Sequence, residues 1–241
     1  MVRPLPPGLQ KVAIEELHED PARVQDDIDA LKTWIQQQPH LRARTDDQFL
    51  VAFLRGCKYS LEKAKSKIDK YYMLRSKFPE LFSLRDVDEP KIQEIIKLGI
   101  GIALPTPLNE DGPRIMLVRN GCYDPEKYNF ADIMRVFQAW NEILMWEDDY
   151  AIVNGFMVVY GSNLDKFYEK IPQKYLPKEY GGENGSIPEI IAEWEQKFQA
   201  YKEYFKEDAK YGTDEHLRPG KPIDFDNLFG MEGSFRKLNV D

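Results

Sequence analysis

Apolar residues change their spacing near residue 100, and this change restricts the folds that are open to the chain. Before it, apolar side chains recur every three or four residues, as along the stripe from Val24 to Ile35. Such spacing indicates amphipathic helices, so the first half reads as a small helical bundle. After it, short runs rich in Ile, Leu and Val are typical of strands. The sequence therefore predicts an α/β fold class with a helical N-terminal bundle.

The strand-like runs cover residues 100–107, 114–120 and 152–160. The first two are separated by a dense turn signal from Asn109 to Pro113. We expect these two runs to pair as strands joined by a hairpin-like loop. The third run is expected to supply a third strand.

Two further helices are expected towards the C-terminus. A short one should cover residues 163–171. Ser186 and Glu189 have the spacing of a capping box, which favours the start of a long helix at that point. Apolar residues then recur at helical spacing as far as Phe205.

The helix expected at residues 130–148 is unusually apolar. Asn129 and Asp132 resemble a capping pair at its start. Its apolar residues cover more than one stripe: Ile133, Met134, Phe137, Trp140, Ile143, Leu144, Met145 and Trp146. Such a helix is either buried in the core on several sides, which is the more common case, or it lines an apolar cavity.

Positive charge is concentrated in one segment of an acidic chain. The net charge is −8, which argues against a general nucleic-acid-binding protein. Residues 51–78 nevertheless hold eight basic and two acidic residues. Lys63, Lys67 and Lys70 align on one helix face. This positive region is either an ordinary solvated helix face or a contact for an anionic surface such as phospholipid headgroups.

Common catalytic and metal-binding patterns are missing from the sequence. The three histidines are far apart in the chain, and no cysteine lies near them at ligand spacing, which argues against zinc. There is no G-x-S-x-G elbow and no Walker A run. We therefore expect no enzyme activity, no catalytic residues and no cofactor. Two cysteines and an N-terminus without an apolar signal region favour the cytoplasm.

Glu147, Asp148 and Asp149 form a run of carboxylates at the expected end of helix 130–148. The helix macrodipole disfavours negative charge at a C-terminus. General acid–base catalysis would need one carboxylate in an apolar setting. We therefore expect these three side chains to lie in water.

Several motifs resemble the CRAL-TRIO lipid carriers. Residues 45–82 are similar to the helical N-terminal module of that family, and LPKEYGGENGS at 176–186 resembles its C-terminal signature. GCYDPEKYNFADIM at 121–134 and the tail from Tyr211 look like the insect group called alpha-tocopherol transfer protein-like. The resemblance implies an N-terminal module at residues 1–88 and a lipid-binding domain at 89–241. It also implies a cytosolic carrier without catalysis, in which a gate helix closes over one lipid of the tocopherol, retinoid or phosphoinositide class.

The chain departs from the family pattern after residue 157. In the family, a middle region supplies a helix, a strand, the gate helix and basic residues before the sequence that resembles Gly161–Leu164. Here roughly sixty residues, about two βα units, are missing at that place. The resemblance therefore implies a truncated domain with a reduced sheet, in which helix 130–148 is partly uncovered and lipid binding is impaired.

These patterns lead to two sets of candidate residues. The lipid-pocket candidates are Ile102, Leu104, Ile133, Phe137, Trp140, Leu144, Met157 and Val159. The candidates for transient contact with an anionic membrane or a phosphoinositide are Arg55, Lys58, Lys63, Lys67 and Lys70. The alternative function is an interaction or self-associating protein that uses the uncovered helix without lipid transfer. The sequence leaves the ligand and the oligomeric state open.

Overall fold

The computed structural model describes residues 2–84, 86–160, 168 and 171–220. Helices dominate it, with two small sheets. Its main helices are α1 (Pro7–Leu17), α2 (Val24–Gln36), α3 (Asp47–Gly56), α4 (Leu61–Lys77), α5 (Pro79–Phe82), α6 (Pro90–Leu98), α7 (Phe130–Glu147), α8 (Asp149–Asn154), α10 (Ile187–Ala200) and α11 (Lys202–Glu207). Its strands are β1 (Leu41–Arg42), β2 (Gly101–Ala103), β3 (Arg114–Val118), β4 (Phe156–Tyr160) and β5 (Gly212–Thr213).

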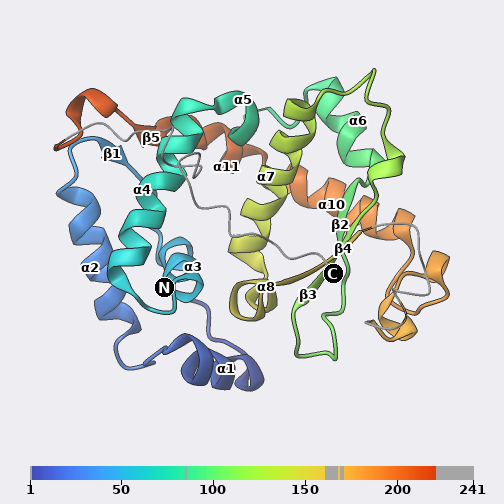
Figure 1. The fold of residues 1–241 in the computed structure, drawn as a ribbon, viewed down its shortest axis with the longest axis horizontal. Coiled ribbons are helices and arrows are strands. Elements are labelled where there is room, and N and C mark those ends of the chain that lie inside the picture. Colours follow the sequence, from blue (N-terminus) through green and yellow to red (C-terminus); the bar gives the residue numbers. More distant parts are fainter. Residues whose placement is uncertain (1, 85, 161–167, 169–170, 221–241) are drawn as a thin grey trace, which may run out of the picture.

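The N-terminal helices form a bundle with its own apolar core. Ile28, Leu31 and Ile35 of α2 are buried, as the stripe in the sequence predicts. Seven consecutive residues of α3, from Phe49 to Arg55, are buried because other helices cover α3 on several sides. Figure 1 shows α1 to α4 on one side of α7 and the larger sheet on the other.

The larger sheet has the order β2-β3-β4. β2 and β3 are antiparallel, with Ile102 opposite Leu117, which confirms the predicted pairing of these two runs. β3 and β4 are parallel, with Ile115 beside Met157. A parallel pair needs a long crossover connection, and α7 lies in the segment that makes it. β1 and β5 form a separate antiparallel pair.

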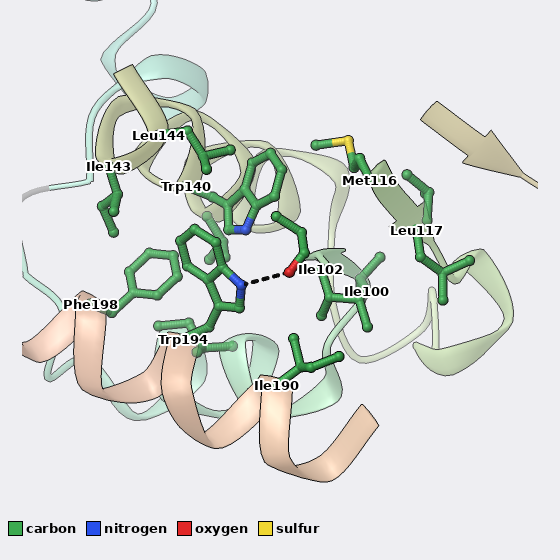
Figure 2. Close-up of a cluster of buried hydrophobic side chains, with 14 of the residues drawn as sticks. Ile100, Ile102, Met116, Leu117, Trp140, Ile143, Leu144, Ile190, Trp194 and Phe198 are labelled. Atoms are coloured by element: carbon green, nitrogen blue, oxygen red, sulfur yellow. Dashed lines mark hydrogen bonds between the residues drawn. The ribbon is translucent and has the colours of Figure 1, made fainter. Parts of the chain in front are cut away.

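α7 occupies the centre of the fold. The Asn129 side chain accepts a hydrogen bond from the Asp132 N–H, which confirms the predicted cap. α7 packs against α3 and α5 on one side, and its Trp140 joins the core with the sheet and α10 on the other. In Figure 2, Trp140 and Trp194 lie side by side, and the Trp194 indole donates to the Ala103 carbonyl oxygen at 3.4 Å. The predicted helix at 130–148 is thus confirmed.

The predicted strand at 152–160 begins too early. Residues Asp149–Asn154 form α8, and only Phe156–Tyr160 is strand. The Asp148 side chain accepts a hydrogen bond from the Ala151 N–H and so starts a second helix. Gly155, at φ 76°, ends that helix and lets β4 begin.

The carboxylate run was expected in water, and this prediction is wrong for two of its three members. Asp148 and Asp149 are buried. Asp148 pairs with Arg114, and Asp149 accepts from Arg3 Nε at 2.8 Å. Because α8 starts here, these carboxylates lie at a helix N-terminus, where the macrodipole favours negative charge.

The C-terminal elements follow the prediction in part. Ser186 and Glu189 form the predicted capping box at the start of α10. The predicted last helix is divided at Tyr201 into α10 and α11. The expected helix at 163–171 falls mostly outside the described residues. The predicted fold class is confirmed, since a helical bundle precedes an α/β region with a reduced sheet.

Candidate functional site

The eight lipid-pocket candidates do not surround one cavity. The strand register places Ile102, Leu117 and Val159 on one face of the sheet. Ile115 and Met157 share that face, and Leu104 follows Ile102 by two positions. The family resemblance implies that these β-strand residues and helix 130–148 enclose the same lipid.

α7 packs against part of the opposite face of the sheet. A Cβ on Gly101 would lie 2.6 Å from Phe137 Cε1, so Phe137 packs over that glycine. The Trp140 ring lies 6.1 Å from the ring of Phe156, a neighbour of Met157 that points to the other face. Figure 2 shows Met116 on the Trp140 side and Leu117 turned away. The candidates therefore line several spaces rather than one, and which of them contact a lipid stays a prediction.

A small hollow does bring three candidates together. Ile102, Phe137 and Trp140 line a space of about 20 Å³, beside Trp194 and Phe198. That volume holds about one water molecule. The other five candidates do not line it. This hollow is therefore too small for a lipid.

A larger cleft lies on the other side of α7. Its volume is about 480 Å³, within the ~300–1,000 Å³ that is usual for small-molecule pockets. Residues of α3, α4 and α5 line one side, and residues of α7, α8 and β4 line the other. We call it the α3–α7 cleft. Leu144 is the only lipid-pocket candidate that lines it.

The lining of the α3–α7 cleft is mainly apolar. Phe53 and Leu144 are buried in its walls, and Met145 and Ile152 are half-buried. Phe156 also lines the cleft and is 40% exposed. A cleft of this kind can accept an apolar molecule with little rearrangement.

A buried ion cluster lies beneath the cleft. Arg75 lines the cleft, and its guanidinium donates to the carboxylates of Glu142 and Asp208. Burial raises the pKa of the Glu142 carboxyl to about 7, and the attraction of Arg75 only partly opposes this. Burial also raises the pKa of Tyr71, another cleft residue, well above 10. Arg75 is thus held by carboxylates and joins α4 to α7.

A basic groove adjoins the α3–α7 cleft. It is lined by Gly56, Cys57, Lys58, Glu62, Lys63, Ser66, Lys67 and Lys70. Lys58, Lys63, Lys67 and Lys70 are exposed, and within the described part of the chain none of them forms an ion pair. Four of the five membrane candidates are thus gathered in one groove.

Arg55, the fifth membrane candidate, does not belong to this groove. Only 2% of Arg55 is exposed, and its Nε donates to Glu19 at 2.8 Å. The Tyr59 hydroxyl donates to the same carboxylate at 2.7 Å. The prediction of a membrane contact is wrong for Arg55, because this arginine neutralises a buried carboxylate beneath the α3–α4 loop. The sequence gives no sign of this ion pair, because Glu19 lies 36 positions before Arg55 and outside its helix.

Apolar surface is exposed mainly on β4 rather than on α7. Phe156, Val158 and Tyr160 are 40%, 40% and 64% exposed and alternate along the strand, so they share one face. In α7 only the terminal residues Phe130 and Glu147 are exposed. The expected uncovered helix is thus largely covered, and the uncovered apolar row belongs to the neighbouring strand.

Two negative findings apply to the residues that the structure describes. No helix among them is both long and apolar enough to span a bilayer. No cluster of His, Cys, Asp or Glu among them has the size needed to hold a metal ion.

Comparisons with known proteins find a family model and several relatives that each match part of the chain. A family model described as "Pinta-like, UBA domain" matches residues 20–92. Clavesin-1 of Xenopus laevis is 30% identical over 159 residues, which cover 63% of this chain and 47% of that protein. Human Clavesin-2 is 28% identical over 155 residues, covering 64% of this chain and 46% of that protein. The chain thus spans less than half the length of these relatives. Their similarity supports a relation to the CRAL-TRIO lipid carriers.

Proposed function

We propose that this chain binds a hydrophobic lipid in the α3–α7 cleft and exchanges it at an anionic membrane surface, as a carrier and not as an enzyme. The observation that carries the proposal is the cleft itself, an apolar space of about 480 Å³ between the helical bundle and α7. The basic groove beside it supports the membrane contact, because Lys58, Lys63, Lys67 and Lys70 present unpaired positive charge there. The similarity to the Clavesins supports a lipid as the ligand.

Finer parts of the proposal concern the ligand and the missing segment. The family resemblance makes tocopherols, retinoids and phosphoinositides the first ligand classes to test, and we propose that the protein acts in the cytoplasm. Roughly sixty residues that would close a family-type pocket are absent after Met157. The exposed row on β4 supports this, because a covered sheet would not leave Phe156, Val158 and Tyr160 open. Tocopherol-like lipids should therefore bind weakly, and tight saturable binding of one tocopherol per chain would contradict this part.

Filling the cleft tests the site. Ile152 is half-buried and lines the cleft, so Ile152→Trp should extend into open space with little loss of stability. We expect binding of a fluorescent retinoid or fatty-acid probe to fall at least tenfold in the purified variant. Ile14→Trp is the matched control, since Ile14 is 45% exposed on α1 and does not line the cleft. Equal loss in both variants, or none in Ile152→Trp, would contradict the cleft as the binding site.

The exposed β4 row favours one alternative function. Phe156, Val158 and Tyr160 would suit an interaction or self-associating protein. Native mass spectrometry separates the two functions. A monomer that carries lipid mass supports the carrier, and a lipid-free oligomer supports the alternative.

A further inference from the structure

The α3–α7 cleft and the basic groove meet along shared residues. Gly56, Lys67 and Lys70 line both hollows. Gly56 has no side chain to separate them, and a Cβ there would lie 3.3 Å from Lys67 Nζ. An apolar space and a cationic space are therefore continuous at the end of α3.

We propose that one anionic single-chain amphiphile occupies both spaces, with its hydrocarbon chain in the α3–α7 cleft and its phosphate between Lys67, Lys70 and Lys63. The inference rests on the proposed function, because it names the class of lipid that the cleft takes. The lysines then serve as a headgroup site within the binding site, in addition to any contact with a membrane surface.

Charge complementarity supports an anionic head. Glu62 is the only acidic residue that lines the groove among the described residues, and it pairs with Lys65 at 2.7 Å. The lysines of the groove therefore keep their charge uncompensated, and a phosphate can bind several ammonium groups at once. Arg75 lies in the same cleft but is held by two carboxylates, so it offers no competing anion site.

The cleft volume supports a single hydrocarbon chain. About 480 Å³ lies in the lower half of the range of ~300–1,000 Å³ for pockets that bury a drug-sized ligand. Leu144 and Phe53 are fixed in the two cores beside the cleft, so widening it for a second chain would disturb core packing.

The test compares ligands that share parts. The full chain is titrated with oleoyl lysophosphatidate below its micelle concentration, with mono-oleoylglycerol, and with glycerol 3-phosphate, by calorimetry and native mass spectrometry. We expect lysophosphatidate to bind one per chain and at least tenfold more tightly than either other ligand. Mono-oleoylglycerol reports the cleft alone, and glycerol 3-phosphate reports the groove alone.

Charge removal adds a second readout. Lys67→Gln with Lys70→Gln should weaken lysophosphatidate binding about 25-fold, at about fivefold per lysine, and weaken mono-oleoylglycerol binding much less, because that ligand carries no phosphate. Lys11→Gln with Lys206→Gln removes the same charge from exposed lysines outside the groove and should change neither. Circular dichroism spectra that match between the variants keep the comparison valid.

Each contrary result has a distinct meaning. If mono-oleoylglycerol binds as tightly as lysophosphatidate, the headgroup site is wrong and the proposed function stands. If neither lysophosphatidate nor mono-oleoylglycerol binds, the proposed function and the inference both fail. Glycerol 3-phosphate that binds as tightly as lysophosphatidate would show a site for free phosphate, and stronger binding of dioleoyl phosphatidate would exclude a single-chain ligand. Either result overturns the inference.

Discussion

Replacing Glu142 by glutamine should stabilise the protein at alkaline pH and leave it nearly unchanged at acid pH. Glu142 is buried beside Arg75, and burial raises its carboxyl pKa from the ordinary value of 4.5 to about 7. A group with a raised pKa in the folded state contributes stability that is present below pH 4.5 and lost as pH rises through 7. Ionised Glu142 therefore costs folding free energy above pH 7, and a neutral amide does not.

The size of the effect follows from the gap between the two pKa values. At ~1.4 kcal/mol per pH unit, the gap corresponds to about 3 kcal/mol. Other ionisable groups face Glu142: Arg75 and Tyr71 on α4, Tyr204 on α11, and Asp208. Arg75 keeps its bond to Asp208 in the variant, so it is not left without a carboxylate.

The assay is urea unfolding followed by tryptophan fluorescence at pH 5, 6, 7 and 8. Glu142→Gln should raise the free energy of unfolding by about 3 kcal/mol at pH 8, with the gain falling towards zero at pH 5. Glu80→Gln, an exposed change on α5 that also replaces one carboxylate by an amide, is the control. A glutamine variant that is less stable than the parent at pH 8 would refute the reasoning, because it would show that attraction to Arg75 outweighs burial.

Three further predictions concern stability and association. Asp148→Ala should lower the free energy of unfolding by about 3 kcal/mol, because it removes the α8 cap and leaves Arg114 without its carboxylate; a loss below 1 kcal/mol would contradict this. Arg55→Ala should cost about 3–5 kcal/mol in urea unfolding by leaving Glu19 buried and uncompensated, whereas an unchanged midpoint would exclude a buried pair. Val158→Lys should reduce light scattering of concentrated protein while leaving the unfolding midpoint in place, and unchanged scattering would show that the β4 row does not drive association.

The parts of the fold that the sequence predicts are those that depend on interactions between residues close together in the chain. The Asn129 cap and the Ser186–Glu189 capping box each depend on residues three positions apart, and β2 and β3 are joined by one loop. Such local signals act within one turn or one loop, so the sequence alone predicts them. The fold class followed from the same patterns.

The candidate site was mostly beyond prediction because its parts come from distant segments. Phe53 and Leu144 face the same cleft although ninety-one positions separate them in the numbering. The buried state of Asp149 depends on Arg3, and that of Arg55 depends on Glu19. The four groove lysines were found in sequence because they follow one helix and the loop before it.

Leu144 belongs to two environments at once, since it packs into the sheet-side core and also lines the α3–α7 cleft. A substitution there cannot reshape the ligand space without also changing the packing that holds α7 in place. Variation in ligand preference among related chains should therefore accumulate on the α4 and α8 margins, at half-buried residues such as Leu74 and Ile152, and spare Phe53 and Leu144. An engineer who wishes to retune selectivity should begin at those margins.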